Sequence, residues 1–125
     1  MIPKGYGRII NTASMSALVA NRGLKGLGPY SASKGAVISL TKVLAVEWAQ
    51  HGITVNSISP GYMKTDMGTR SQTLKGFKEL QLSLIPQGRL GLPEEYAHAV
   101  LYLASEHAGH TTGMNLVMDG GYTAW

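Results

Sequence analysis

Hydrophobic and polar residues follow two rhythms along this chain, and together they predict a strand, a helix and a second strand in succession. Residues 7–13 (GRIINTA) form a short apolar run that begins at a glycine and ends in small residues, which predicts a buried strand. Apolar residues recur at helical spacing from about residue 30 to residue 50, and Gly52 is a good helix stop. Residues 53–58 (ITVNSI) predict a second strand. The short joints between these elements indicate a right-handed parallel crossover.

The second half of the chain continues the mixture of helix and strand. Residues 61–92 form a long mixed segment with an amphipathic helix predicted near 73–84, and segments of this length often cover a binding site. Pro93 and the two glutamates after it predict the start of another helix, with proline in the first turn and acids at its positive end. Residues 114–118 predict a final strand before Asp119. With no internal repeat or second domain, we expect one α/β domain built on a parallel sheet.

The helix predicted over residues 30–50 carries apolar residues around an unusually wide arc. These residues are Ala36, Val37, Leu40, Val43, Leu44 and Trp48. An amphipathic helix that covers one surface needs only a single apolar stripe. We therefore expect this helix to be buried on two sides, against the sheet and against another helix or a second subunit.

Composition narrows the class of protein without identifying its function. The chain has 125 residues, of which 44% are hydrophobic and 14% are charged, as in an ordinary soluble domain. The lack of cysteine excludes a disulfide scaffold and a thiolate metal site, and it fits a reducing, cytoplasmic location. No apolar run approaches the ~18 residues that span a bilayer, and the N-terminus lacks the apolar segment of a signal peptide.

The charged residues and histidines favour no further class of partner. The net charge of +4 comes from lysine and arginine residues spread along the chain, which favours a solvated surface over a nucleic-acid or membrane partner. The four histidines lack the spacing of metal ligands, apart from a weak pair at His107 and His110. We therefore expect no metal site, no nucleic-acid partner and no membrane partner.

Three short motifs place reactive side chains where the predicted parallel strands end. Ser14 follows the first strand, and Tyr30 and Lys34 stand about one helical turn apart on one face of the helix. Pro60-Gly61 follows the second strand and leads to Thr65. Open α/β sheets bind ligands beyond the carboxyl ends of their strands, so we expect the three motifs to converge there.

This set of side chains suits proton transfer to a carbonyl oxygen. A nearby ammonium stabilises a phenolate, so Lys34 would help Tyr30 to act as acid and base, while Ser14 would hold the same oxygen by a hydrogen bond. Each motif alone is weak, because a tyrosine and a lysine four apart also occur on exposed helices, and serine or Pro-Gly also occur in plain turns. Their order along the chain makes them informative.

Four stretches in this order resemble the short-chain dehydrogenase/reductase family over essentially the whole chain. They are Gly7-Arg-Ile-Ile-Asn-Thr-Ala-Ser14, Tyr30-Ser-Ala-Ser-Lys34, Val55-Asn-Ser-Ile-Ser-Pro-Gly61 with Thr65, and Thr112-Gly-Met-Asn-Leu-Val-Met-Asp-Gly-Gly121. The resemblance implies that Ser14, Tyr30 and Lys34 are the catalytic residues and that the cofactor is NAD or NADP. It also implies that the cofactor is bound by Tyr30, Lys34, Pro60, Gly61, Met63 and Thr65.

The chain departs from the family pattern in what it lacks. The family's glycine-rich turn, which cradles the pyrophosphate, and the asparagine of its proton relay have no counterpart. Only the last three strands of a doubly wound, Rossmann-like sheet are predicted. We therefore expect residues 1–125 to be a single partial domain, the catalytic half, with the dinucleotide-binding half absent. Alone, such a chain would expose a strand edge, and we expect it to have little or no activity. The choice between NAD and NADP stays open, because the residue that distinguishes the two cofactors at the ribose belongs to the missing half.

Two further polar residues help to predict the class of substrate. Ser16 and Asn21 lie close to Ser14 and Tyr30 and suit hydrogen bonds to a polyhydroxylated substrate, although such side chains also satisfy loop backbone. The Ser14–Asn21 stretch and the Gly-Gly-Tyr-Thr-Ala-Trp tail resemble family members that act on sugar alcohols and ketoses, such as sorbose, mannitol, arabinitol and galactitol. The expected reaction interconverts a secondary alcohol and a ketone.

Two alternatives to this function stay open. The same catalytic core would support a reductase for 3-oxoacyl thioesters. A non-catalytic remnant that acts only by associating with full-length relatives would also retain the apolar helix over residues 30–50, because family members pair through this helix. The full-length form is expected to be a homo-oligomer, either a dimer or a tetramer.

Overall fold

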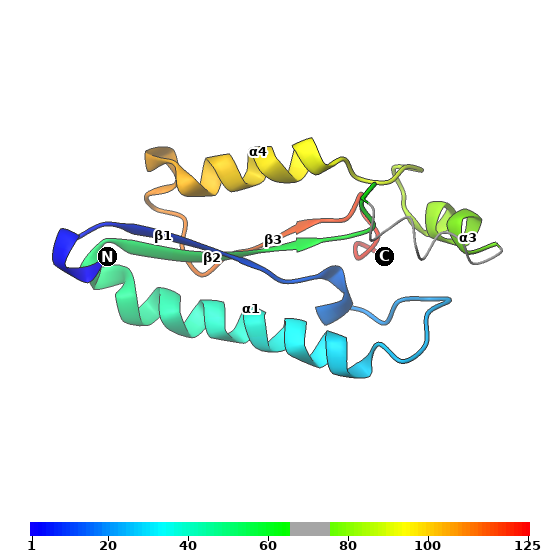
Figure 1. Ribbon diagram of the computed structural model, residues 1–125, viewed down its shortest axis with the longest axis horizontal. Coiled ribbons are helices and arrows are strands. Elements are labelled where there is room, and N and C mark those ends of the chain that lie inside the picture. Colours follow the sequence, from blue (N-terminus) through cyan, green and yellow to red (C-terminus); the bar gives the residue numbers. More distant parts are fainter. Residues whose placement is uncertain (66–75) are drawn as a thin grey trace.

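A parallel sheet forms the middle layer of the molecule, and helices cover both of its faces (Figure 1). The computed structural model describes residues 1–65 and 76–125. The sheet has the order β1-β2-β3, with β1 at Gly7–Thr12, β2 at Ile53–Pro60 and β3 at Asn115–Met118. Helix α1 (Gly28–Trp48) lies on one face and α4 (Pro93–Ala104) on the other. These elements confirm the predicted α/β class, and the parallel pairing of β1 with β2 confirms the predicted crossover.

The predicted boundaries hold to within a few residues. Helix α1 begins at Gly28 rather than at Tyr30, because Pro29 suits a helical first turn, where no N–H donor is needed. A 3-10 turn at Ala49–His51 extends α1 to Gly52, which adopts the left-handed conformation (φ 68°). Further 3-10 turns span Ile2–Lys4, Met15–Ala17 and Glu106–Ala108. Helix α3 (Phe77–Leu84) matches the later part of the helix predicted near 73–84, and residues 73–75 lie outside the described residues.

The core forms where β2 packs between α1 and α4. Every residue from 53 to 59 is buried, as expected for a strand covered on both faces. On the α1 side, Ala45, Ile53 and Val55 form one buried cluster, against which Ile9, Leu44 and Trp48 pack.

Side chains of β1 alternate between the two helices. Asn11 Nδ2 donates to Thr41 Oγ1 of α1 at 2.9 Å. Thr12 Oγ1 lies 2.8 Å from the Tyr96 hydroxyl of α4. The period-two alternation therefore ties the strand to both helical layers.

The outer face of α1 is apolar and exposed. Leu40, Val43 and Val46 are 52%, 51% and 82% exposed, whereas Ala45 and Thr41 on the sheet side are buried. The packing against the sheet confirms one half of the two-sided burial predicted for this helix. Contact of the outer face with another helix or a subunit stays a prediction.

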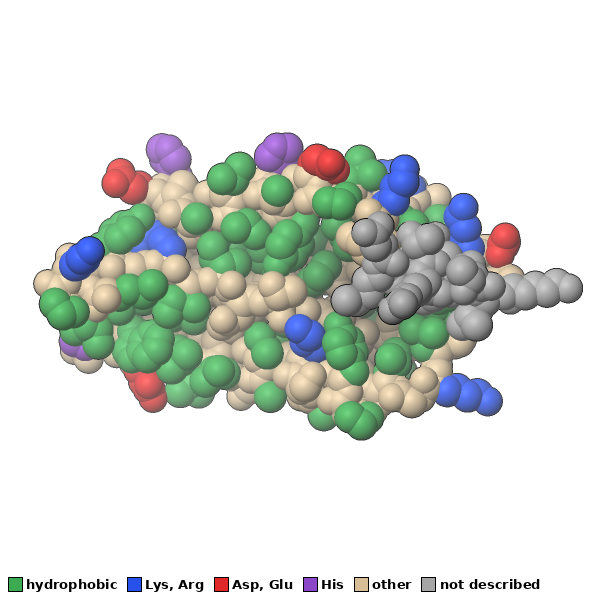
Figure 2. Space-filling view, viewed as in Figure 1, with side chains coloured by type: hydrophobic (Ala, Val, Ile, Leu, Met, Phe, Trp, Pro, Cys, Tyr) green, Lys and Arg blue, Asp and Glu red, His purple; other side chains and the backbone are tan. Residues whose placement is uncertain are grey.

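The edge of the sheet at β1 is likewise open within the described residues. There, β1 pairs with β2 and with no other strand. Figure 2 shows hydrophobic side chains gathered between the sheet and each helical layer on this side of the molecule. A hollow of about 390 Å³ beside the start of β1 is lined by Met1, Ile2, Pro3, Ile9, Trp48 and Ile53. Across the described residues, no helix is both long enough and apolar enough to span a membrane.

Candidate active site

Ser14 lies just beyond the end of β1, at the carboxyl edge of the sheet. Its side chain is buried (7% exposed), and its Oγ accepts the Ser16 N–H at 3.1 Å as the cap of the short turn that begins at Met15. The hydroxyl proton of Ser14 is not used in this bond, since a hydroxyl both accepts and donates. The loop-starting role considered for Ser14 and its role as a hydrogen-bond donor are therefore compatible.

Tyr30 and Lys34 lie together on the first turns of α1, as their spacing predicts. The Lys34 Nζ is 5.8 Å from the centre of the Tyr30 ring, and it donates to the Thr12 carbonyl oxygen at 2.9 Å. Thr12 is the last residue of β1, so this bond fixes the ammonium to the strand that leads to Ser14. The Tyr30 side chain is 45% exposed. The bond to Thr12 was not predicted, because a backbone carbonyl has no signal in the sequence.

The Pro60-Gly61 turn emerges at the same edge of the sheet. The Gly61 N–H donates to the Met118 carbonyl at 2.9 Å, which joins the turn to the end of β3. Met63 forms an isolated parallel bridge with Gly91, and the Thr65 N–H donates to the Met63 carbonyl at 3.0 Å. The parallel register of β1, β2 and β3 therefore brings all three motifs to one edge of the sheet, as expected.

Ser16 and Asn21 occupy different surroundings. Ser16 is buried and contributes its backbone N–H to the Ser14 bond. Asn21 Nδ2 donates to the Tyr62 hydroxyl at 3.2 Å, while its Oδ1 is buried without a hydrogen-bond partner among the described residues. An unpaired buried amide oxygen is costly unless a ligand or a water satisfies it. Asn21 therefore retains one acceptor for a further group.

An aromatic cluster that the sequence did not predict lies beside the turn. Tyr62 follows Gly61, and its ring packs edge-on against Phe77 at 6.2 Å and against Tyr122 at 5.7 Å between ring centres. Burial raises the pKa of the Tyr62 hydroxyl above its ordinary value; the Asn21 amide opposes this effect, and Tyr122 adds to it. The sequence feature that could have indicated this cluster is the aromatic residue directly after the Pro-Gly turn.

An ion pair secures the segment that leads into α4. Arg89 donates two hydrogen bonds to the Glu95 carboxylate, at 2.9 and 2.6 Å, and the Leu92 N–H donates a third at 2.8 Å. The Arg89 guanidinium and then the Leu92 N–H lower the pKa of Glu95 to about 2. This arrangement confirms the predicted helix start at Pro93 and fixes the chain near Gly91, where Met63 is bridged.

Comparisons with known proteins agree with this fold and site. A family model described as enoyl-(acyl carrier protein) reductase matches residues 1–123. The galactitol 2-dehydrogenase (L-tagatose-forming) of Cereibacter sphaeroides is 45% identical over 125 residues, covering 100% of this chain and 49% of the relative. The 3-oxoacyl-[acyl-carrier-protein] reductase of Rickettsia typhi is 43% identical over 121 residues, covering 97% of this chain and 48% of the relative. The solved gluconate 5-dehydrogenase of Burkholderia cenocepacia, in complex with NADP and tartrate, has a TM-score of 0.91 at 35% identity, covering 99% of this chain and 48% of that one.

The described sheet and helices belong to the Rossmann-like class of doubly wound α/β folds. Within that class, the chain belongs to the short-chain dehydrogenase/reductase family. Both the family resemblance and its likeness to members that act on sugar alcohols are thereby confirmed. The chain spans about half the length of the curated relatives it matches.

Proposed function

We propose that the protein is an NAD- or NADP-dependent oxidoreductase that interconverts a secondary alcohol and a ketone on a sugar alcohol or ketose. The observation that carries the proposal is the Lys34 ammonium held beside the Tyr30 ring at the carboxyl edge of the sheet, in a chain of this family. In this proposal Tyr30 gives its proton to the carbonyl oxygen during reduction and takes it back during oxidation. Ser14 donates its remaining hydrogen bond to the same oxygen.

The residues at this edge fit a nicotinamide nucleotide. An ammonium has three N–H donors, and the described residues use one of those of Lys34, on the Thr12 carbonyl. The others suit two neighbouring ribose hydroxyls. The backbone of Pro60, Gly61, Met63 and Thr65 is proposed to border the nicotinamide amide. When bound, the nicotinamide supplies or accepts the hydride, while this chain orients the substrate and moves the proton.

The substrate class rests on the polar groups around Ser14. The buried Oδ1 of Asn21, which has no hydrogen-bond partner among the described residues, is an acceptor that a substrate hydroxyl would satisfy, and Ser16 lies on the same loop. The 45% identity to a galactitol dehydrogenase supports the same class. A steroid or acyl substrate would instead want apolar walls.

A second candidate function is the reduction of a 3-oxoacyl thioester. It is favoured by the 43% identity to the Rickettsia reductase, whose name states that activity. Both reactions use the same acid–base residues, so the assay must distinguish them by substrate.

The proposal extends to the rest of the molecule. We infer that residues 1–125 act as the catalytic half of a larger domain, since the chain covers about half of each relative. The exposed apolar face of α1 supports a homo-oligomer of the full-length form. The cytoplasmic location expected from the composition stays a prediction.

The experiment that tests the function measures NAD(P)H by absorbance with the full-length protein. Galactitol, sorbitol and an acetoacetyl thioester are offered with each cofactor, and the 125-residue chain alone is expected to give little or no turnover. Tyr30→Phe should lower kcat/KM by about 10²- to 10⁴-fold, as for loss of a general acid–base group. The matched control is Tyr6→Phe, because Tyr6 is also exposed and also lies beside a cation, with the Arg8 guanidinium 4.5 Å from its ring centre. Full activity in Tyr30→Phe would refute the mechanism.

A further inference from the structure

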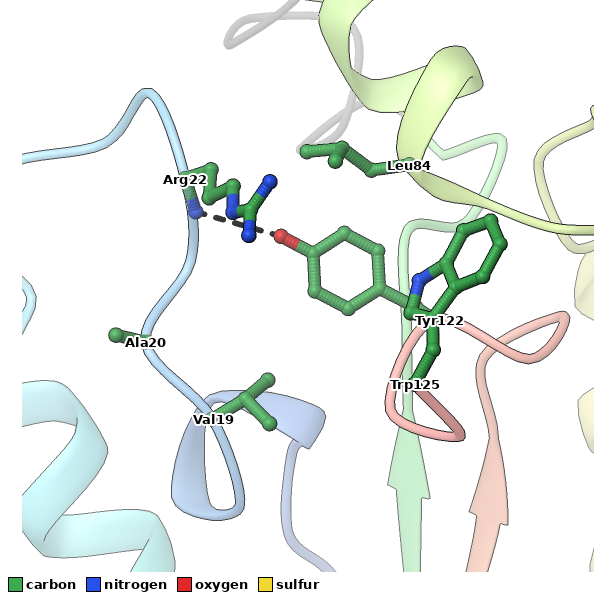
Figure 3. A pocket seen from close by; sticks show the side chains of 6 residues that line it. All are labelled: Val19, Ala20, Arg22, Leu84, Tyr122 and Trp125. Atoms are coloured by element: carbon green, nitrogen blue, oxygen red, sulfur yellow. Dashed lines mark hydrogen bonds between the residues drawn. The ribbon is translucent and has the colours of Figure 1, made fainter.

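The loop that leads into α1, residues 18–27, is bordered by two cavities. One of about 470 Å³ lies between this loop, the end of α3 and the C-terminal tail, and Arg22 and Tyr122 line it (Figure 3). The other, of about 460 Å³, lies between the loop and the start of α1. Val19 and Ala20 line both cavities. Atoms that border a cavity lack packing contacts on that side, so the position of this loop depends on the contacts that its next residues make.

Three consecutive residues of the loop are each held by a different part of the chain. Asn21 Nδ2 donates to the hydroxyl of Tyr62, in the turn after β2, at 3.2 Å. The Arg22 backbone N–H donates to the hydroxyl of Tyr122, in the C-terminal tail, at 3.3 Å, as Figure 3 shows. Gly23 lies against α3, since an added Cβ would be 2.6 Å from a leucine side chain of that helix. The loop is therefore fixed at Asn21 and at the two residues after it.

The ring of Tyr62 is itself held on two sides. It packs edge-on against Phe77 of α3 at 6.2 Å and against Tyr122 at 5.7 Å between ring centres. Both partners are buried. Edge-on aromatic pairs contribute about 0.5–1.5 kcal/mol beyond the burial of their surface. The Tyr62 hydroxyl therefore has a fixed position from which to hold the Asn21 side chain.

This bond determines which end of the Asn21 amide stays available. An amide has a donor end and an acceptor end. Because Tyr62 accepts from Nδ2, the free end is Oδ1, which is buried without a hydrogen-bond partner among the described residues. Asn21 lines the 460 Å³ cavity together with Ser16 and Ser31, and Ser31 directly follows Tyr30. The amide therefore borders the same cavity as residues next to the proposed acid–base group.

We propose that Tyr62 is a positioning residue for the substrate, because it holds the Asn21 amide with Oδ1 free to accept a hydrogen bond from a substrate hydroxyl. The inference rests on the proposed function, which supplies the polyhydroxylated substrate. Tyr62 acts through Asn21 and not by touching the reacting atoms. Without its hydroxyl the amide can rotate, and ordering a side chain during binding costs about 0.5–1.5 kcal/mol. Tyr62 thus improves substrate binding by ordering Asn21 beforehand.

Calorimetric titration with galactitol tests this inference without turnover. The full-length protein is held in complex with reduced cofactor, NADH or NADPH, with which an alcohol cannot react. Tyr62→Phe removes the hydroxyl and keeps the ring, and it should weaken galactitol binding about three- to ten-fold, as for the loss of one neutral hydrogen bond. In the Asn21→Ala background the same change should have no further effect, because the two residues act as one unit.

The matched control is Tyr102→Phe. The Tyr102 hydroxyl also lies 3.2 Å from a side-chain partner, Thr111 Oγ1, but it belongs to α4. Its loss should leave galactitol binding unchanged. Tyr62→Phe keeps the ring contacts with α3 and the tail, so the variant should fold, and urea unfolding checks this. In turnover assays the loss should appear in KM for galactitol rather than in kcat, because the proposed catalytic residues are untouched.

The outcomes separate this inference from the proposed function. Unchanged galactitol binding in Tyr62→Phe, or an equal loss with and without the Asn21 side chain, would overturn the inference. Oxidation of galactitol by the original protein would then leave the proposed function standing. Binding that weakens as expected, in a protein that does not oxidise galactitol, would support the positioning role and overturn the proposed reaction. A lack of galactitol binding in the original protein would overturn the inference, whatever other substrate is turned over.

Discussion

Replacing Gly61 with alanine tests whether close backbone packing fixes the turn after β2. An added Cβ would lie 2.7 Å from both Cα and Cβ of Asp119 and 3.3 Å from Sδ of Met15. Carbon atoms pack best at about 3.5–4.0 Å, so either the turn or Asp119 must move. The Asp119 carboxylate accepts the N–H of Gly121, at 2.9 Å, and the N–H and hydroxyl of Thr123, at 2.9 and 2.7 Å. The displacement therefore has to strain the turn or break these bonds.

A second glycine provides a matched comparison for the expected change in unfolding free energy. Overpacking of this kind costs about 1–3 kcal/mol of unfolding free energy. Gly35 lies inside α1, and an added Cβ there would meet no atom within 4 Å. Gly35→Ala should therefore stabilise the protein by roughly 0.5–1 kcal/mol, through helix propensity and a less flexible unfolded chain. The same chemical change should have opposite signs at the two positions.

Urea unfolding of the full-length protein measures both free energies, and cofactor titration measures the consequence for the site. Gly61→Ala should also raise KM for the cofactor, since the proposed nicotinamide-binding turn is displaced. An unfolding free energy for Gly61→Ala within about 0.5 kcal/mol of the original protein would refute the packing argument, because changes that small are typical of unconstrained surface sites. Destabilisation by Gly35→Ala would refute the comparison.

Two further predictions concern other parts of the fold. Asn56→Ala should cost about 2–5 kcal/mol in urea unfolding, because the fully buried Asn56 side chain bonds the Thr111 carbonyl and the Met114 N–H, at 2.8 and 3.1 Å, and both groups lose that partner. A loss below about 1 kcal/mol would contradict this expectation. Glu95→Gln should lower the melting temperature at neutral pH. Since the folded pKa of Glu95 is depressed, its contribution is present above about 4.5 and is lost as the pH falls towards about 2. Melting curves against pH should therefore be flatter for Glu95→Gln over that range than for the control Glu94→Gln, and identical slopes would exclude the ion pair's role.

The elements of the fold could be predicted because their patterns are local. Periodicity gave α1 and β2, and the left-handed glycine at position 52 stops the helical segment as expected. Strand β2 runs two residues beyond the predicted 53–58, to Pro60. Its end is set by pairing with β3, in which Pro60 lies opposite Met118, and the sequence of β2 alone does not contain that information.

The same distinction between local patterns and long-range contacts applies to the residues of the candidate site. The spacing of Tyr30 and Lys34 within one helix predicts their proximity, and the structure places them together. The contact of Asn21 with Tyr62 joins residues 41 positions apart, and that of Arg22 with Tyr122 joins residues 100 apart. Such contacts depend on the path of the loops, which neither periodicity nor motif spacing encodes. The cavity that Arg22 and Tyr122 border could therefore not be predicted from the sequence.

Polar residues inside β2 explain how the sheet holds the site in register. A buried strand is usually apolar, and burying a hydroxyl or an amide is unfavourable unless it is paired. Here Ser57 and Ser59 both donate to the Asn115 Oδ1 of β3, at 2.9 and 2.8 Å, and Asn56 holds the segment just before that strand. A shift of one residue between β2 and β3 would break these bonds and move every side chain to the opposite face. The polar pairs therefore favour a single register, and that register sets where the Pro60-Gly61 turn emerges beside Ser14.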